Sequence, residues 1–132
     1  MLLDKATLLK PAMPRIERVN GENGDFVFVR ALPMGNVDEY ENENYVFNAE
    51  SGKMSLNRRN YRSRLLVRAI CDDKGIPLLT LKDIDAISKQ SGKFWDDCYR
   101  AALRLNGLSG REDVERAEKN SDSAPGVDSA LP

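Results

Sequence analysis

The pattern of polar and apolar residues near the start of the chain predicts a β-hairpin. Residues 15–19 alternate between polar and apolar, and residues 25–32 are rich in β-branched and aromatic side chains. Asparagine and glycine dominate residues 20–24 between these runs, and both tolerate the positive φ of a turn. We therefore expect two strands, with Pro33 ending the second. Apolar residues occupy both faces of the second strand, so helices should cover one face and a partner or the preceding segment the other.

The segment 34–57 lacks a clear period and is interpreted as an acidic loop. It contains acidic and aromatic residues in close succession: Asp38, Glu39, Glu41, Glu43 and Glu50, with Tyr40, Tyr45 and Phe47. A short helix near 36–43 fits part of the pattern, but the frequent asparagines favour a loop. Two interpretations stay open: a solvated acidic face, or a docking surface whose aromatic side chains anchor a partner.

The second half of the chain has the apolar spacing of helices. A helix over 60–70 should present one apolar face, made of Tyr61, Leu65, Leu66, Ala69 and Ile70. The arginines in and just before it are expected mostly on its other sides: Arg58, Arg59, Arg62, Arg64 and Arg68. The turn at 72–75 then ends the helix, and residues 76–79 form a short extended link.

Capping residues set the bounds of the later helices. Thr80 and Asp83 form a capping box that opens a helix over about 80–89. The next helix begins at residue 91 or 92, and its apolar face is Phe94, Trp95, Cys98, Ala101, Ala102 and Leu105. Gly107 ends it by taking the left-handed conformation. A second capping box, from Ser109 to Glu112, opens a short helix that ends near residue 120.

These elements predict an α+β fold that is mainly α, with an N-terminal β-hairpin followed by a compact bundle of three to four helices. The chain of 132 residues has room for one ordinary domain. Its parts are an irregular lead-in (1–14), one globular domain (15–120) and a disordered tail (121–132). Within the domain we expect the hairpin (15–32), the acidic loop (34–57) and the helical half (58–120). The tail is expected to be disordered because it is too polar to bury a core.

Composition excludes several classes of function. Basic and acidic residues balance at 20 against 21, so the net charge of −1 attracts neither nucleic acid nor an acidic membrane. The chain has no histidine, which removes the commonest general base and metal ligand. Cys71 and Cys98 have no metal-binding or redox spacing, so we expect buried free thiols in a reducing cytoplasm. We find neither a membrane-spanning run nor a signal peptide.

Other candidate sites fail on spacing. Counted from Asp72, the ligand positions of a calcium loop hold Lys74, Ile76 and Asp83, which do not fit that template. The side chains of Asp96 and Asp97 point about 100° apart on a helix, so they cannot share a substrate as an acid–base pair. There is no glycine-rich phosphate loop and no nucleophile elbow. We therefore expect a protein that is not an enzyme and that needs no cofactor.

The arginine-rich helix has two interpretations. Five arginines within 58–68, with Tyr61 among them, suit phosphate binding, and a small DNA-binding or regulatory protein is the alternative function. No recognition helix follows, however, and the acidic segment balances the charge. A basic face that meets the acidic face of another copy is favoured, because unlike surfaces generate head-to-tail rings or spirals. Arg59 and Arg62 are the candidates for these self-contacts.

Short motifs follow one another in a fixed order between residues 24 and 120. They read Gly24-Asp-Phe-Val-Phe-Val-Arg-Ala-Leu, Arg62-Ser-Arg-Leu-Leu-Val-Arg-Ala-Ile-Cys-Asp-Asp-Lys-Gly-Ile-Pro-Leu-Leu-Thr, Asp83-Ile-Asp-Ala-Ile, Arg100-Ala-Ala-Leu-Arg-Leu-Asn-Gly-Leu and Glu118-Lys-Asn. This ordered set resembles the tail assembly chaperones of long-tailed, non-contractile bacteriophages and related prophages.

The resemblance implies a non-enzymatic role in tail morphogenesis. Members of this family keep the tape-measure protein soluble and bring it to the major tail tube protein in the host cytoplasm. They are absent from the finished particle and tend to form spiral oligomers. Many also have a longer form made by a ribosomal frameshift. Glu118-Lys119-Asn120 is compatible with the codons GAA-AAA-AAC, which contain the slippery heptamer A-AAA-AAC.

Four aromatic residues are our candidates for exposed anchors that bind a partner: Phe26, Phe28, Tyr40 and Tyr45. For each of them, a place in the core or on the open surface remains the alternative.

Overall fold

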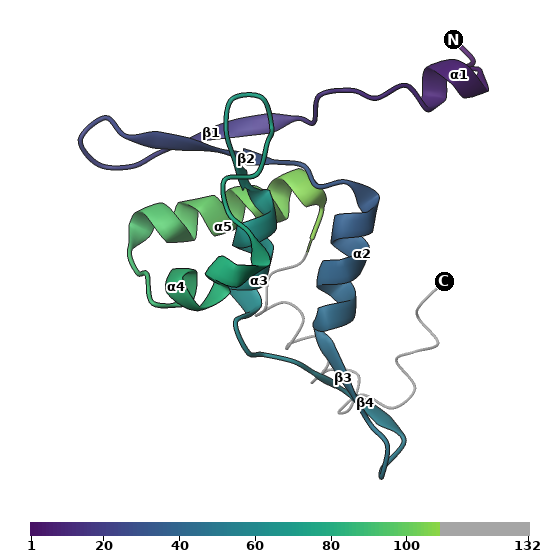
Figure 1. Cartoon of the computed structure of the whole chain (residues 1–132), viewed down its shortest axis with the longest axis vertical. Helices are drawn as coiled ribbons and strands as arrows, with labels where there is room; N and C mark the ends of the chain where they lie inside the picture. The colour runs from purple at the N-terminus through teal and green to yellow at the C-terminus, as the bar shows by residue number, and fades with distance from the viewer. Residues whose placement is uncertain (109–132) are drawn as a thin grey trace, which may run out of the picture.

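The structure is a computed structural model that describes residues 1–108. In chain order its elements are α1 (Lys5–Leu8), β1 (Ile16–Asn20), β2 (Phe26–Arg30), α2 (Met34–Glu43), β3 (Tyr45–Asn48), β4 (Lys53–Leu56), α3 (Tyr61–Ala69), β5 (Ile70–Cys71), a 3-10 turn η1 (Leu81–Asp83), α4 (Ile84–Ser88) and α5 (Lys93–Asn106). The strands form two antiparallel sheets, β1-β2-β5 and β3-β4. The first sheet lies at one end of the molecule and the second at the other, with helices α2 to α5 between them, while α1 lies on the N-terminal segment that extends away from the body (Figure 1).

A hairpin forms near the N-terminus where the alternating pattern predicts one. β1 and β2 pair along their whole length, and Asn23 and Gly24 take φ values of 58° and 83° in the turn between them. On its other edge β2 pairs with β5, where Val29 lies opposite Ile70. β2 is therefore the central strand of this sheet, and Val29 is fully buried.

The predicted fold class, an N-terminal hairpin followed by a helical bundle, is wrong. Strands occur across the chain, because β3 and β4 separate α2 from α3 and β5 follows α3 directly. β5 consists of Ile70–Cys71 alone, which is too short to show a strand period. Ile70 also continues the apolar face of α3, so local spacing assigns it to the helix. Only its pairing with β2, distant in the sequence, makes it a strand.

The segment 34–57 is not a loop, contrary to expectation. α2 forms because Tyr40 packs against Tyr61 of α3, with ring centroids 5.9 Å apart, which anchors an otherwise polar helix. The asparagines that favoured a loop instead occupy ends and turns. Asn44 is the C-cap of α2. The side-chain oxygen of Asn48 accepts two backbone N–H groups in the β3–β4 turn, at 2.9 and 3.3 Å.

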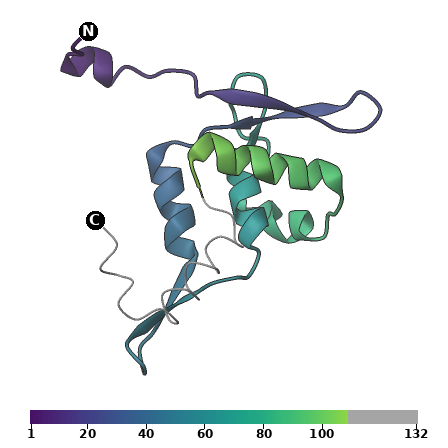
Figure 2. The ribbon, with the colours of Figure 1, turned by 180° about the vertical axis from the view of Figure 1, so that it is seen from behind.

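The core lies between the three-stranded sheet and helices α3 and α5. Its most deeply buried residues are Val29, Leu65, Ala69, Cys98, Ala101 and Ala102. α5 contacts β1, β2 and α3, and the small side chains on its inner face allow that close approach. Seen from behind, α5 crosses the end of α3 and α2 stands beside both (Figure 2).

Arginines belong to this core, although the helical pattern placed most of them on outer faces. Arg64 and Arg68 of α3 are buried, as is Arg30 of β2. Nε of Arg30 donates to the backbone oxygen of Arg68 at 2.9 Å. Because α2 packs where an open loop was expected, this side of α3 faces protein rather than water. Buried guanidinium groups persist only when they are hydrogen-bonded, and each of these three has at least one acceptor within the protein.

The capping predictions within the described residues are confirmed. The side chain of Thr80 caps the turn that leads into α4, and Asp83 Oδ2 accepts the backbone N–H of Thr80 at 2.8 Å. Gly107 is the C-cap of α5 with φ 60°. The second capping box, the tail at 121–132 and the tripeptide at 118–120 lie outside the described residues.

Candidate partner-binding groove

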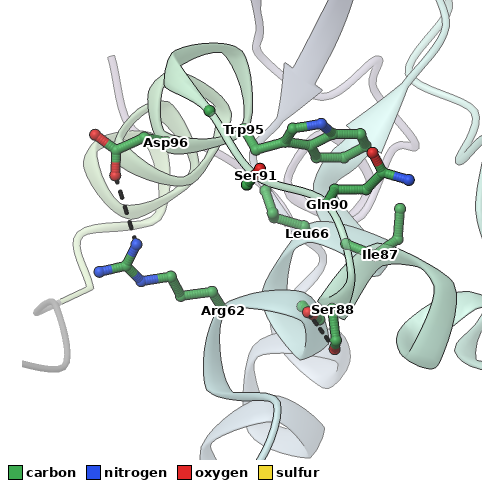
Figure 3. Close-up of a pocket in the computed structure, with 10 residues that line it drawn as sticks. Arg62, Leu66, Ile87, Ser88, Gln90, Ser91, Trp95 and Asp96 are labelled. Atoms are coloured by element: carbon green, nitrogen blue, oxygen red, sulfur yellow. Dashed lines mark hydrogen bonds and ion pairs between the residues drawn. The ribbon is translucent and has the colours of Figure 1, made fainter.

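A groove of about 320 Å³ lies between α3, α4 and the start of α5 (Figure 3). Its apolar lining consists of Leu66 from α3, Ile87 from α4 and Trp95 from α5. Ser63, Ser88, Gln90, Ser91 and Asp96 supply its polar lining together with Arg62. The groove therefore combines an aromatic and aliphatic floor with a hydrogen-bonding rim.

The short connection between α4 and α5 shapes this groove. Gly92 begins α5 with φ 110°, a value that side chains other than glycine rarely adopt. The turn presents Trp95 to the groove, while Cys98, one turn further along α5, is fully buried. Helical spacing alone places Trp95 on the core face. The sharp reversal at Gly92 leaves it only partly covered.

Hydrogen-bonded hydroxyl groups form one wall. The hydroxyl oxygens of Ser63 and Ser88 lie 2.7 Å apart, and Ser88 is also 3.0 Å from the side-chain oxygen of Asn60. The Ser88 hydroxyl further donates to the backbone oxygen of Ile84 at 2.8 Å. These contacts tie α4 to the first turn of α3, so this wall is held in place before any partner binds.

An ion pair forms the opposite wall. Nη1 of Arg62 lies 3.6 Å from Oδ1 of Asp96, and Nε of Arg100 lies 3.0 Å from Oδ2 of the same carboxylate. The Arg62 guanidinium also stands over the ring of Tyr99, 5.1 Å from its centroid. All three charged groups are exposed enough to exchange partners, because surface ion pairs contribute little stability.

The structure separates the four predicted anchors. Phe26 is 45% exposed at the end of the first hairpin, where the Arg18 guanidinium lies 3.6 Å from its ring centroid. Phe28 is half-buried on the same strand. Tyr45 is exposed on the second hairpin. Tyr40 is only 2% exposed, so its expected role as an exposed anchor is wrong: it is the residue that attaches α2 to α3.

The arginine-rich helix offers only part of its charge to a partner. Arg59 and Arg62 are exposed, as the self-contact prediction requires. Arg64 instead points inward, and it donates to the backbone oxygens of Arg59 and Asn57 at 3.1 and 3.0 Å. Its Nη1 also donates to the Asn44 side chain at 2.9 Å. A guanidinium held by three acceptors is not available to a phosphate.

The titratable groups show no catalytic arrangement within residues 1–108. Burial raises the pKa of the Cys98 thiol to about 12, so it is a neutral core group. Backbone N–H groups of Ile76 and Lys74 lower the pKa of Asp72, whose carboxylate is thereby committed to its own turn. The same residues hold no cluster of three acidic or cysteine side chains that would bind a metal ion. None of their helices has the length and apolar character to cross a bilayer.

Comparison with known proteins yields a similarity at the level of structure. No protein-family model and no curated protein sequence matches the chain. Among solved structures, the chain is similar to the bacteriophage HK97 tail assembly chaperone, with a TM-score of 0.53 and 14% identity. The alignment covers 78% of this chain and 91% of the other. The likeness is one of fold. The chain thus shares the architecture of a phage tail assembly chaperone over nearly all of that protein.

Proposed function

We propose that this protein is a phage tail assembly chaperone, which keeps the tape-measure protein soluble and brings it to tail tube subunits. The observation that carries the proposal is the fold shared with the HK97 tail assembly chaperone, which extends over 91% of that chain. The ordered motifs between residues 24 and 120 support the same family. The role is non-enzymatic, and it is exercised in the host cytoplasm and not in the finished particle.

The groove between α3, α4 and α5 is the proposed site for the tape-measure protein. An apolar side chain of that partner would cover Trp95, Leu66 and Ile87, which together form the floor. Large aromatic residues inside a polar rim are typical of the few positions that carry most of the binding energy. The serine and glutamine side chains around the floor provide hydrogen bonds for the backbone on either side of the bound side chain.

Phe26 on the first hairpin is the second proposed contact with the partner, with Phe28 behind it. Their rings meet edge to face with centroids 5.7 Å apart. Arg59 and Arg62 are proposed to contact other copies of the chain, where the exposed acidic side chains of α2 carry the opposite charge. Many copies could then coat one long client.

Co-expression with the tape-measure protein tests the proposed function. We expect the wild-type chaperone to retain that protein in the soluble fraction and to co-elute with it in gel filtration. Trp95→Ala should lower the amount of soluble client. Gln90→Trp should do the same by filling the groove without removing core packing, since Gln90 is exposed. Leu81→Ala, an exposed apolar position outside the groove lining, is the matched control.

The co-expression assay tests the chaperone function and the groove separately. A client that aggregates beside folded wild-type chaperone, with folding verified by circular dichroism, contradicts the proposed function. If wild type, Trp95→Ala and Gln90→Trp all keep the client equally soluble, the result supports the chaperone function but contradicts the groove as the binding site.

A further inference from the structure

Apart from a smaller patch at Ile76, Leu78 and Leu81, two extended surfaces of exposed apolar side chains have no partner among the described residues. The first is the N-terminal arm, residues 1–13, in which every residue is exposed. Its large apolar side chains are Met1, Leu2, Leu3, Leu8, Leu9 and Met13. The second is one face of the β3–β4 hairpin. The arm and the hairpin lie at opposite ends of the molecule, and the arm points away from the body (Figures 1 and 2).

The pairing register of the hairpin puts its apolar residues on one side. Tyr45 lies opposite Leu56 and Phe47 opposite Met54, and these two pairs share a face because side chains alternate along a strand. The other face carries Val46 opposite Ser55 and Asn48 opposite Lys53. Phe47 and Met54 are 59% and 60% exposed. One face is therefore continuous and apolar, and the other is mainly polar.

An isolated hairpin of this kind needs a covering surface. Two strands without a third strand or a packed helix are marginally stable in water. β3 and β4 form a sheet of their own, and among their residues only Leu56 is partly buried, while the others are exposed. The apolar face is thus a surface that gains stability when another element packs on it.

The arm is also built for a contact outside its own body. Pro14, which follows the arm, is the first residue of the chain that packs on the body. Its ring lies beside Gly75, at the position that a Cβ of residue 75 would occupy. Before Pro14, Asp4 caps the single turn of α1 by accepting the Thr7 N–H at 2.8 Å. Paired leucines on both sides of that turn give it apolar side chains to insert. An arm with local order and an exposed apolar surface is ready to dock.

Charge decides between the exposed apolar surfaces as the docking site. The arm, residues 1–13, carries two basic side chains, Lys5 and Lys10, and one acidic one, Asp4, a net charge of +1. The hairpin itself carries one acidic and one basic side chain, Glu50 and Lys53, while the adjoining helix α2 carries four acidic ones, so residues 34–57 have a net charge of −4. A third apolar patch, Ile76, Leu78 and Leu81, lies within a stretch 72–83 that is nearly neutral, with three aspartates and two lysines. The basic arm is therefore complementary to the acidic helix α2, which leads directly into the hairpin.

We propose that the N-terminal arm of one molecule docks on the apolar face of the β3–β4 hairpin of a second copy. The two surfaces differ, so the contact is head-to-tail, and a bound pair still offers one free arm and one free hairpin to further copies. This inference rests on the self-association included in the proposed function, and it adds the arm and the hairpin to Arg59 and Arg62 as surfaces that meet between copies. The partner is this same chain, and no client is involved.

Sedimentation velocity of the full chain over a series of concentrations tests the contact. Wild type should increase in mass with concentration, and added salt should weaken this because it screens the charge attraction. The arm variant L8D/L9D and the hairpin variant F47D should each weaken association by at least about tenfold, as expected when a buried apolar anchor is lost. Val46→Asp, on the opposite face of the same strand, is the matched control and should associate like wild type.

Mixing the two blocked variants gives the sharpest result. L8D/L9D retains an intact hairpin and F47D retains an intact arm, so an equimolar mixture should form a dimer that grows no further. A wild type that stays monomeric at all concentrations, or a mixture that stays monomeric, overturns the proposal. So does an arm variant that associates like wild type, because another occupant, such as residues 109–132 of a neighbour, would then cover the hairpin.

Further measurements separate this contact from docking on the third patch and from a loss of fold. Leu78→Asp should leave association unchanged, and a loss of association there would place the arm on the third patch and overturn the proposal. Circular dichroism of each variant verifies the fold. The client co-expression assay is independent: a soluble client with failed mixing rejects only the contact, while successful mixing with an aggregated client rejects only the chaperone function.

Discussion

Arg68 in α3 and Glu43 at the end of α2 lie 25 residues apart in sequence and form an ion pair that joins the two helices. Nη2 of Arg68 lies 2.8 Å from Oε2 of Glu43. The Arg68 side chain is 4% exposed and that of Glu43 is 37% exposed, so the two partners differ sharply in their access to water. Nη1 of Arg68 also donates to the backbone oxygen of Arg64 at 2.8 Å.

This difference in exposure predicts unequal effects of the two single substitutions. Glu43→Gln leaves a buried guanidinium without its counter-charge and should lower the free energy of unfolding by about 1–3 kcal/mol. Arg68→Met should lower it less, because the Glu43 carboxylate that remains can hydrate. Urea unfolding of both variants and of the double variant measures this. A larger loss of unfolding free energy for Arg68→Met than for Glu43→Gln would contradict the view that the buried Arg68 depends more on the pair than Glu43 does. The double variant should lose less unfolding free energy than the sum of the two single variants.

Arg64→Ala distinguishes a structural arginine from a nucleic-acid ligand. Its guanidinium has three acceptors within the protein, so we expect the free energy of unfolding to fall by about 2–3 kcal/mol. Arg59→Ala, at an exposed position, should change it by less than about 0.5 kcal/mol. Chemical unfolding of both variants provides the comparison.

The DNA-binding alternative predicts that the protein binds DNA through its exposed arginines. It requires salt-sensitive retention of wild type on DNA and loss of that retention in Arg62→Ala with the fold intact. We expect no mobility shift of wild type with duplex DNA even at low salt, because Arg64 and Arg68 are buried in the core. A shift at low salt that Arg62→Ala removes would support the alternative instead.

The sequence predicts the elements whose signals are local. The first hairpin, the helix over 60–70 and the capping box at Thr80 depend on neighbouring residues, and each is present. β5 and α2 depend on distant contacts: Ile70 becomes a strand residue only beside β2, and α2 is held by Tyr40 against α3. Periodicity carries no information on such pairings, which is why the fold class was wrong.

Asn106 shows how a residue recognised for one role can have a second. Together with Gly107 it predicts the end of α5, and the helix ends there. Its side-chain oxygen also accepts the backbone N–H of Leu32 at 2.6 Å, and its amide donates to the backbone oxygens of Arg30 and Ala102 at 3.3 and 2.9 Å. It therefore connects the end of α5 to the end of β2.

Asn106→Ala should accordingly be one of the more damaging polar substitutions. It leaves a partly buried N–H group and a carbonyl without partners, and we expect the free energy of unfolding to fall by about 2–3 kcal/mol. Asn36→Ala is the matched control, since that side chain has one exposed hydrogen bond, and it should change stability by about 0.5 kcal/mol or less. Equal losses in thermal unfolding for the two variants would contradict the bridging role.

The candidate groove was missed at the level of sequence for a geometric reason. Helical spacing assigns Trp95 to a core face, and both Trp95 and Ile87 do pack against the core. What exposes one side of each is the angle between α4 and α5, which depends on the turn at Gly92. The sequence indicates that a helix begins near Gly92. It does not indicate the φ of 110° at Gly92 or the groove that results between α4 and α5.

Gly75 and Gly52 provide a matched pair for testing the anchor of the N-terminal arm. Both have positive φ, 79° and 70°, so an alanine at either position is strained by about 1–2 kcal/mol. A Cβ at Gly75 would also stand 2.6 Å from Cγ of Pro14, while a Cβ at Gly52 has nothing within 4 Å. Gly75→Ala should therefore lower stability by at least about 1 kcal/mol more than Gly52→Ala.

Removing the Pro14 ring should abolish that difference. In the double variant Gly75→Ala with Pro14→Ala, the clash is gone and only the backbone strain at residue 75 remains. Unfolding curves of the two single glycine variants, of Pro14→Ala and of the double variant form a complete cycle. A difference between Gly75→Ala and Gly52→Ala that persists in the absence of the Pro14 ring would mean that Pro14 does not restrict the side chain at position 75.

Cys98 gives a prediction for alkaline pH. Burial raises the pKa of its thiol from the ordinary 9.0 to about 12, so between these values the unfolded chain has lost the proton while the native chain keeps it. The unfolded state then binds fewer protons, and the free energy of unfolding falls as pH rises from 9 toward 12. Cys98→Ala, although less stable at neutral pH because it leaves a small cavity, should show a shallower decline across this range. Urea denaturation of both proteins at several pH values measures how the free energy of unfolding changes with pH, and parallel slopes would contradict the raised pKa of the Cys98 thiol. The same burial predicts that Cys98 reacts with a thiol reagent at pH 8 only as fast as the protein opens.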